Sequence, residues 1–170
     1  MFYFIAIISV IAGVLIDQYS KYLAATYLPE NTVKLIDGVF HLHYLENRGA
    51  AFGILQNQQL FFLIATIITL IFVTFLYVKL PRTKHFLPLR ICLIAMSAGA
   101  IGNMIDRIRL HYVIDFFYFV PIDFPIFNVA DIYASVATAV LIFLFVFYYK
   151  EEDFDIIFQL FKKKRHQEKQ

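Results

Sequence analysis

The stretch LFFLIATIITLIFVTFLYV, residues Leu60–Val78, runs for nineteen positions without a charged side chain. A helix needs about 20 mostly apolar residues to cross the hydrocarbon core of a bilayer. Three further apolar blocks have comparable length, at Phe2–Ile16, Leu87–Ile105 and Ala130–Tyr149. The whole chain of 170 residues is 61% hydrophobic and only 16% charged, whereas a soluble domain carries about 25% charged residues. These blocks predict an all-α membrane protein with four transmembrane helices.

The first block is short before Asp17 interrupts it. We expect it to continue as a helix through Lys21 to Leu28, with its polar residues at the outer end. The alternative is a cleaved signal peptide, which needs a basic amino-terminal region and a small-residue cleavage site. Met1–Phe4 carries no charge and the residues around Asp17 make a poor cleavage site. A retained first span is therefore favoured.

The basic residues predict the orientation, because Lys and Arg accumulate in short cytoplasmic loops. Ten lie between the second and third blocks or after the fourth: Lys79, Arg82, Lys84, Arg90, Lys150, Lys162, Lys163, Lys164, Arg165 and Lys169. Five lie in the other two connections: Lys21, Lys34, Arg48, Arg107 and Arg109. We therefore expect both termini in the cytoplasm and residues 18–59 and 106–130 at the outer face. The basic tail is interpreted as a topology signal and not as a nucleic-acid patch.

The tail after the fourth block has a second pattern. Phe154, Ile157, Phe158 and Phe161 recur at helical spacing before the lysine run. This predicts a short amphipathic helix lying on the anionic inner leaflet. The chain is accordingly divided into a four-span domain, residues 1–150, and a cytoplasmic tail, residues 151–170.

Residues 31–56 mix apolar and polar residues and are not a span. Asp37-Gly38 is a turn signal, so we expect two or three short strands at the outer membrane surface. His41 and His43 alternate on one strand face, which makes metal binding conceivable. Zinc sites need at least three protein ligands, and no third is evident nearby. No metal site is predicted.

A small, flexible strip follows these strands. Gly49–Gly53 reads GAAFG, and glycine permits close backbone approach. The strip is either an ordinary loop re-entering the membrane or a flap against a ligand, with Asn47 as a hydrogen-bonding side chain. Local chemistry leaves both interpretations open.

Several ionisable residues lie at the edges of the spans, where they are costly and often functional. Asp17 and Lys21 stand four apart on one helix face and can form a structural ion pair. Asn103, Asp106 and Arg107 share a face at the end of the third span, whereas Arg109 is expected to be solvated. Small residues at Ala95, Ala98, Gly99 and Gly102 allow a neighbouring helix to approach closely. The third span is therefore predicted to be central, with its polar end inside the bundle.

Two carboxylates flank a short outward loop that contains Pro121 and Pro125. Asp115 lies among Val, Ile, Phe and Tyr residues, and Asp131 opens the fourth span, where Asn128 can cap the helix. Two close carboxylates share one proton, so one can activate water while the other polarises a carbonyl, as in aspartic proteases. Two alternatives stay open at this point. In one, Asp131 is a purely structural helix cap; in the other, the carboxylates serve proton-coupled transport.

Five stretches together resemble the bacterial lipoprotein signal peptidases, signal peptidase II. They are DQYSK (17–21), NRGAAFG (47–53), GNMIDR (102–107), VIDF (113–116) and FNVAD (127–131). Each is weak alone, but they occur in family order with family-like spacing. The resemblance implies a membrane aspartic endopeptidase with a small extracytoplasmic β-rich segment between helices one and two. Such enzymes cleave diacylglyceryl-modified prolipoproteins just before the lipidated cysteine.

The resemblance also implies site residues. Asp115 and Asp131 match the family's catalytic pair. Residues that support the pair or contact substrate are matched by Asn47, Gly49, Asn103, Arg107 and Asn128. Asp17, Lys21 and Asp106 match structural or supporting positions. No metal or organic cofactor is implied, globomycin-type cyclic peptides are expected inhibitors, and we expect a monomer in the bacterial cytoplasmic membrane.

One departure from the family pattern is visible. The family often has glycine where this chain has His111, so the local backbone is expected to differ. Two rival functions stay open on the sequence. A proton-coupled transporter requires polar groups at mid-membrane on several spans, whereas here they cluster at the outer ends. A non-catalytic membrane scaffold predicts that replacing Asp115 or Asp131 is harmless.

Overall fold

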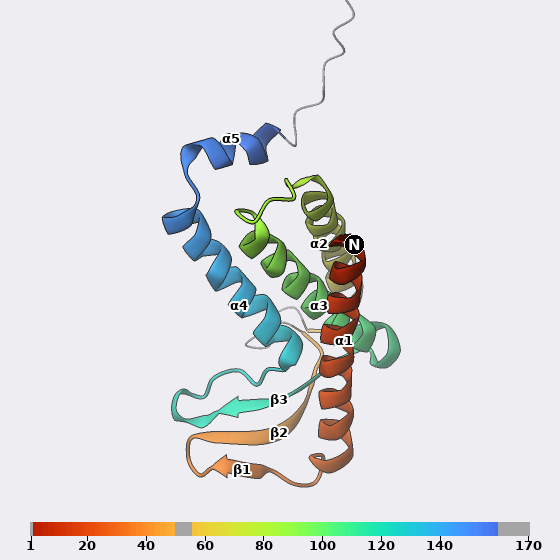
Figure 1. The fold of residues 1–170 in the computed structure, drawn as a ribbon. Helices are drawn as coiled ribbons and strands as arrows, with labels where there is room; N and C mark the ends of the chain where they lie inside the picture. The colour runs from red at the N-terminus through yellow and green to blue at the C-terminus, as the bar shows by residue number, and fades with distance from the viewer. Residues whose placement is uncertain (1, 50–55, 160–170) are drawn as a thin grey trace, which may run out of the picture.

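The computed structural model describes residues 2–49 and 56–159. Within these ranges, four helices are long and apolar enough to cross a membrane (Figure 1). They are α1 (Phe2–Tyr27), α2 (Gln59–Lys79), α3 (Leu87–Leu110) and α4 (Val129–Phe143), which continues as a π-helical turn over Leu144–Tyr148. The predicted spans and the continuation of the first one are confirmed.

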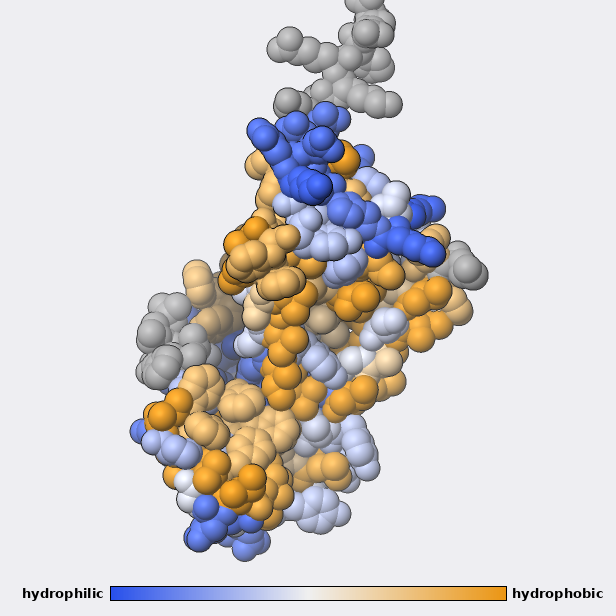
Figure 2. All heavy atoms as spheres, turned by 60° about the vertical axis from the view of Figure 1, so that its left-hand side comes forward, coloured by the Kyte–Doolittle hydropathy of each residue, from blue (hydrophilic) through white to orange (hydrophobic). Residues whose placement is uncertain are grey.

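The helices turn most of their apolar side chains outward. α2 buries Val73 but exposes Ile64, Ile68 and Ile71 by roughly half or more. Figure 2 shows a broad hydrophobic surface along the bundle between hydrophilic residues at its two ends. A soluble protein rarely exposes such a patch, so this surface faces lipid and the protein is a multi-pass membrane protein.

α3 lies at the centre of the bundle and packs against α1, α2 and α4. Its small residues make this possible. A Cβ atom on Gly99 would lie 2.5 Å from the Ala130 carbonyl oxygen, and one on Gly102 would collide with the Asp17 carboxylate. The close approach predicted from the small-residue spacing is thus present, and it brings the polar end of α3 against α1 and α4.

A three-stranded antiparallel sheet forms from the described strands. Its order is β1 (Val33–Ile36), β2 (Phe40–Asn47), β3 (Val113–Phe119). The sequence predicts strands within residues 31–56, where β1 and β2 lie, but it predicts no strand around Asp115, where β3 lies. Val113 to Phe116 are all buried, so the strand lacks the polar alternation that marks a half-exposed strand.

The sheet packs on the end of α1 through Ala24, Leu28, Ile114 and Phe116. It lies at one end of the bundle, whereas the connection between α2 and α3 lies at the other (Figure 1). Both segments predicted to face outward therefore meet at the same end of the molecule.

His111 ends α3 with a φ of +65°, in the left-handed region, and its N–H donates to the Arg107 carbonyl at 3.2 Å. A glycine adopts this conformation without the cost of about 1 kcal/mol that a side chain brings. The turn that glycine favours is therefore present here despite the histidine.

The amphipathic pattern of the tail forms α5 (Glu151–Gln159). Phe154 and Ile157 pack against the apolar core at this end of the bundle, and His85 Nε2 lies 2.9 Å from Asp153 Oδ1. Phe158 stays exposed. Phe161 and the lysine run lie outside the described residues. Contact of α5 with a membrane surface and its division from residues 1–150 stay predictions.

Candidate active site

A cleft of about 320 Å³ lies where β2 and β3 meet the ends of α2, α3 and α4. The predicted site residues that line it are Asn47, Gly49, Asn103, Arg107, Asp115 and Asp131. Asn128 is fully buried beside the cleft. Ser135, one turn after Asp131, also lines it. The cleft thus gathers side chains from five elements that are distant in sequence.

Asp131 is held at the amino-terminal end of α4. Asn128 caps this helix: its Oδ1 accepts from the Asp131 N–H at 3.0 Å, and the Asn128 N–H donates to Asp131 Oδ2 at 3.1 Å. Asn103 Nδ2 donates to the other carboxylate oxygen, Asp131 Oδ1, at 2.9 Å. The predicted cap is confirmed, and the helix dipole at this position favours a negative charge.

Asp115 projects from β3 and is 1% exposed. Asn47 Nδ2 donates to its Oδ2 at 2.8 Å, and Asn128 Nδ2 donates to its Oδ1 at 2.6 Å. The Asn128 side chain therefore contacts both members of the predicted pair, since its oxygen accepts from the Asp131 backbone. Phe127 pairs with Phe117 across the loop, and this bridge brings the start of α4 back beside the strand.

The pKa of Asp115 is raised to about 7. Burial is the largest cause, because it penalises the ionised form, and the negative charge of Asp131 adds to it. The amide donors of Asn47 and Asn128 act in the opposite direction but do not outweigh burial. Asp115 therefore keeps a proton at a pH where an ordinary aspartate has lost it.

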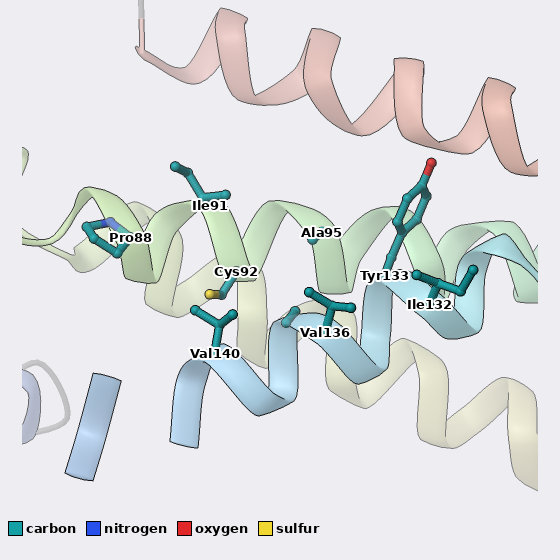
Figure 3. Close-up of a pocket in the computed structure, with 9 residues that line it drawn as sticks. Pro88, Ile91, Cys92, Ala95, Ile132, Tyr133, Val136 and Val140 are labelled. Atoms are coloured by element: carbon teal, nitrogen blue, oxygen red, sulfur yellow. The ribbon is translucent and has the colours of Figure 1, made fainter. Parts of the chain in front are cut away.

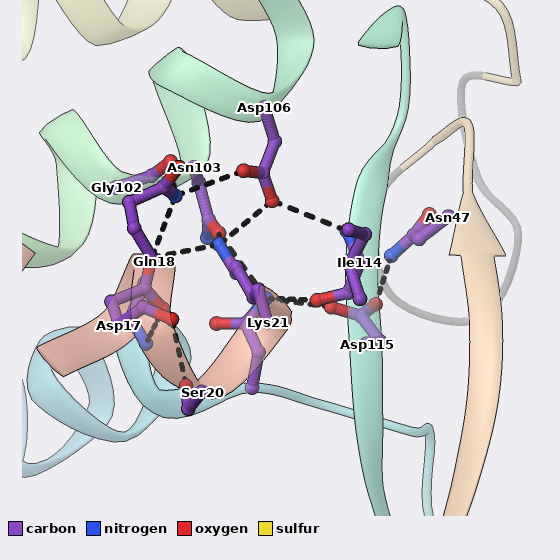
Figure 4. A network of polar contacts seen from close by, with 12 residues as sticks. Asp17, Gln18, Ser20, Lys21, Asn47, Gly102, Asn103, Asp106, Ile114 and Asp115 are labelled. Carbon is purple, nitrogen blue, oxygen red and sulfur yellow. Dashed lines mark hydrogen bonds and ion pairs between the residues drawn. The ribbon is translucent and has the colours of Figure 1, made fainter. Parts of the chain in front are cut away.

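Behind the cleft, one buried ammonium group lies between two buried carboxylates (Figure 4). Lys21 Nζ lies 2.9 Å from Asp17 Oδ2 and 2.9 Å from Asp106 Oδ2. It also donates to Asn103 Oδ1 at 2.8 Å. The predicted pair of Asp17 and Lys21 is confirmed, but Asp106 is a second partner that the spacing did not predict.

The same network joins α1 to the elements that carry the two aspartates. The Ala130 N–H at the start of α4 donates to Asp17 Oδ1 at 2.9 Å, and the Ile114 N–H in β3 donates to Asp106 Oδ2 at 3.2 Å. Gln18 Nε2 donates to Asp106 Oδ1 at 2.9 Å. Because Ile114 and Ala130 each precede an aspartate, the network positions both.

The cleft wall also contains residues that do not contact the two aspartates directly. The Arg107 guanidinium lies 4.7 Å from the centre of the Phe62 ring, a cation–π contact that the sequence could not identify among the many phenylalanines. Arg109 is exposed, as predicted.

The Gly49 N–H donates to Asn47 Oδ1 at 3.0 Å and so orients that amide toward Asp115. Residues 50–53 of the GAAFG strip lie outside the described part, so the loop and the flap both stay open.

Other candidates carry no comparable chemistry. A groove of about 350 Å³ between α3 and α4 is lined by aliphatic residues apart from Cys92 and Tyr133 (Figure 3). His43 Nδ1 lies 2.8 Å from Thr32 Oγ1, and His41 meets the Tyr118 ring edge-on. Across residues 2–49 and 56–159, no three His, Cys, Asp or Glu side chains gather in a way that could hold a metal ion.

Comparison with known proteins shows the family of this chain. The sequence profile of the family described as signal peptidase (SPase) II matches residues 9–147. The chain belongs to the signal peptidase II family. Among its relatives, the lipoprotein signal peptidase of Caldanaerobacter subterraneus subsp. tengcongensis is 45% identical over 145 residues, which are 84% of this chain and 96% of that protein. That of Streptococcus thermophilus is 43% identical over 147 residues, 86% of this chain and 93% of the relative.

Two solved structures share the fold of this chain. A bacterial membrane enzyme determined in meso at 2.3 Å resolution superposes with a TM-score of 0.76 at 32% identity, covering 83% of this chain and 87% of that one. A second, at 1.9 Å, gives 0.74 at 31% identity, covering 85% and 94%. The helical membrane fold with its small sheet is therefore shared with experimentally determined bacterial membrane enzymes.

Proposed function

We propose that this member of the signal peptidase II family removes the signal peptide from diacylglyceryl-modified prolipoproteins, and that it does so as an aspartic endopeptidase. The observation that supports an aspartic mechanism is the hydrogen bonding of Asn128. Its side chain bonds to the Asp115 carboxylate and to the Asp131 backbone, and both aspartates line one cleft. Family membership supports the substrate class.

In the proposed reaction Asp131 is the base. Asn103 and the Asn128 N–H each donate to one of its carboxylate oxygens, and the start of α4 favours the ionised form. Lys21 donates to the oxygen of the Asn103 amide, so the amide nitrogen faces Asp131. Asp131 takes a proton from a water molecule as the water oxygen attacks the scissile carbonyl carbon.

Asp115 is the proposed acid. Its pKa, raised to about 7, keeps the carboxyl protonated at pH values below that, so it can donate to the carbonyl oxygen as negative charge develops there. When the tetrahedral intermediate collapses, the C–N bond breaks and the leaving amine takes a proton from the pair. The products are a signal peptide with a free carboxylate and a lipidated cysteine with a free amine.

The position of the cleft suits a substrate that cannot leave the membrane. Each buried CH₂ of a lipid chain contributes about 0.8 kcal/mol to membrane binding, so the diacylglyceryl group keeps the scissile bond near the bilayer surface. The sheet lies at one end of the bundle (Figure 1). The cleft is lined by residues of β2 and β3 at this end, and Phe124 and Phe127 form part of its apolar wall. A globomycin-type peptide lodged between the two aspartates would block this cleft.

Cleavage of a synthetic prolipoprotein peptide tests the substrate. With the purified full chain in detergent, we expect the diacylglyceryl-modified peptide to be cut before its cysteine, with kcat/KM at least about 100-fold above that of the unmodified peptide, because lipid binding positions the bond. Mass spectrometry of the products locates the cut. Equal cleavage of both peptides would contradict the proposed substrate class.

The acid role of Asp115 predicts a pH dependence. Its pKa is raised, so the required protonated form is lost as the pH rises through about 7. We expect kcat/KM to fall by about tenfold per pH unit well above pH 7. Initial rates between pH 6 and 9 on the lipidated peptide measure this. A rate that stays level or increases up to pH 9 is incompatible with a protonated Asp115.

The proposed orientation has both termini in the cytoplasm and the cleft toward the outer face. Lys21 and Arg90 are buried in helices, so they do not count as loop charges. Most of the remaining basic residues still lie between α2 and α3 or after α4. A cysteine at Thr83, between α2 and α3, is expected to resist an impermeant thiol reagent in intact cells, in a Cys92→Ala background. A cysteine at Asp123, in the loop before α4, should react readily. The reverse labelling pattern would invert the topology.

A further inference from the structure

At the end of the bundle opposite the cleft, two tyrosine rings lie between two guanidinium groups. The Arg82 guanidinium lies 4.6 Å from the centre of the Tyr3 ring, and its Nη2 donates to the Tyr3 hydroxyl at 2.7 Å. The Tyr3 and Tyr77 ring centres are 6.3 Å apart. The Arg90 guanidinium lies 4.9 Å from the Tyr77 ring centre. We name this row of four side chains the Arg–Tyr ladder.

The positive charge of the ladder is not neutralised within the described chain. Neither Arg82 nor Arg90 forms an ion pair with a carboxylate of residues 2–49 or 56–159. Arg90 is 3% exposed, and although its Nη2 donates to the Leu80 carbonyl, its Nε and Nη1 have no partner in the described structure. A buried charge without a counter-charge is costly, so an anion near the ladder would be stabilising.

An apolar groove of about 510 Å³ begins at the ladder. Tyr3 and Tyr77 line its mouth, and it continues between α1, α2 and α3 as far as Ile11, Leu70 and Ile101. Ile11 lies eight residues after Tyr3, which corresponds to about 12 Å along the helix axis at 1.5 Å per residue. The groove is therefore elongated along α1 and mostly apolar, and the cations lie beside one end of it.

We propose that the ladder and groove bind one anionic phospholipid, with its phosphate at Arg82 and one acyl chain in the groove. Arg82 is exposed and uses one of its five N–H donors on Tyr3, which leaves others for phosphate oxygens. A free phosphate ion would not use the groove, and a zwitterionic lipid would bring its own cation to the unpaired guanidinium groups. The site is separate from the catalytic cleft and does not depend on the proposed reaction.

Native mass spectrometry of the full chain in detergent tests the site. The protein is titrated with phosphatidylglycerol or phosphatidylcholine that carry identical acyl chains. We expect the first phosphatidylglycerol to bind at least about tenfold tighter than the first phosphatidylcholine. Arg82→Gln should abolish this preference and leave phosphatidylcholine binding unchanged. Val10→Phe, which fills the groove, should weaken both lipids.

Two matched variants separate the site from general effects. Arg109→Gln removes an exposed arginine at the other end of α3, and Ile68→Phe enlarges an exposed residue of α2 outside the groove. Both should bind the two lipids as the unmodified protein does. Any one of four results would overturn the proposal. Two concern affinity: equal binding of the two lipids, or displacement of the lipid by inorganic phosphate at comparable concentration. Two concern the variants: equal losses of lipid binding in Arg82→Gln and Arg109→Gln, or no effect of Val10→Phe.

Discussion

Replacing Asp131 with asparagine is expected to reduce kcat on the lipidated peptide by about 10⁴-fold, the upper end of what an acid–base group contributes. Asparagine keeps the size of the side chain and can still accept hydrogen bonds, but it cannot take a proton from water. Asp115→Asn should have a similar effect, since a neutral amide cannot transfer a proton to the carbonyl oxygen of the scissile bond. Product formation by mass spectrometry and helical content by circular dichroism measure activity and folding separately.

Asp123→Asn is the matched control for these variants. Asp123 lies in the loop between the two aspartates, is exposed, and adopts a φ of +48°, which asparagine tolerates. Its replacement changes the charge of the loop without touching the cleft, so activity should stay within about twofold of the unmodified enzyme. If the Asp131→Asn variant kept a tenth or more of the activity, the catalytic pair would be wrong and the scaffold function would regain support.

Lys21→Met is expected to lower the free energy of unfolding by about 3–5 kcal/mol, because it leaves two buried carboxylates without their shared cation. Asp17 is 0% and Asp106 3% exposed, so water cannot compensate for the loss. The melting temperature in detergent should fall by about 10 °C. Adding Asp106→Asn to this variant should recover part of the loss, since one uncompensated charge is then removed.

Lys34→Met provides the contrast for that experiment. Lys34 Nζ lies 2.9 Å from Asp37 Oδ1, the same separation as in the buried pair, but the two side chains are 59% and 80% exposed. Exposed ion pairs contribute at most about 1 kcal/mol, so the melting temperature should barely change. Equal losses in the Lys21 and Lys34 variants would show that burial of the network does not matter, and the positioning role given to Lys21 would then fail.

Local patterns in the sequence were sufficient for much of the fold. The apolar blocks predicted the four spans, because only a helix of about 20 residues satisfies its own backbone hydrogen bonds across a bilayer. The spacing of Asp17 and Lys21 predicted their contact, and Asn128 before Asp131 predicted the cap. Each of these depends on residues within one helix, so the sequence alone contains the necessary information.

The proposed catalytic roles of Asp115 and Asp131 rest chiefly on the family resemblance. Physical reasoning alone left transport and a structural cap open, since nothing local shows that two carboxylates sixteen residues apart lie beside one cleft. The bridge between Phe117 and Phe127 brings them together, and it depends on a strand, β3, whose continuous burial removed the usual alternation of polar residues.

By itself, therefore, the sequence determined the membrane class, the four spans, the capped start of α4 and the identity of the polar residues near the sheet end of the bundle. Only the tertiary structure decided how they meet: Asn47 against Asp115, Lys21 between Asp17 and Asp106, and Phe62 against Arg107. The physical reason is distance along the chain. Contacts three or four residues apart follow from helix geometry, whereas contacts such as that of Asp17 with Ala130 exist only after α3 has packed closely against α1 and α4.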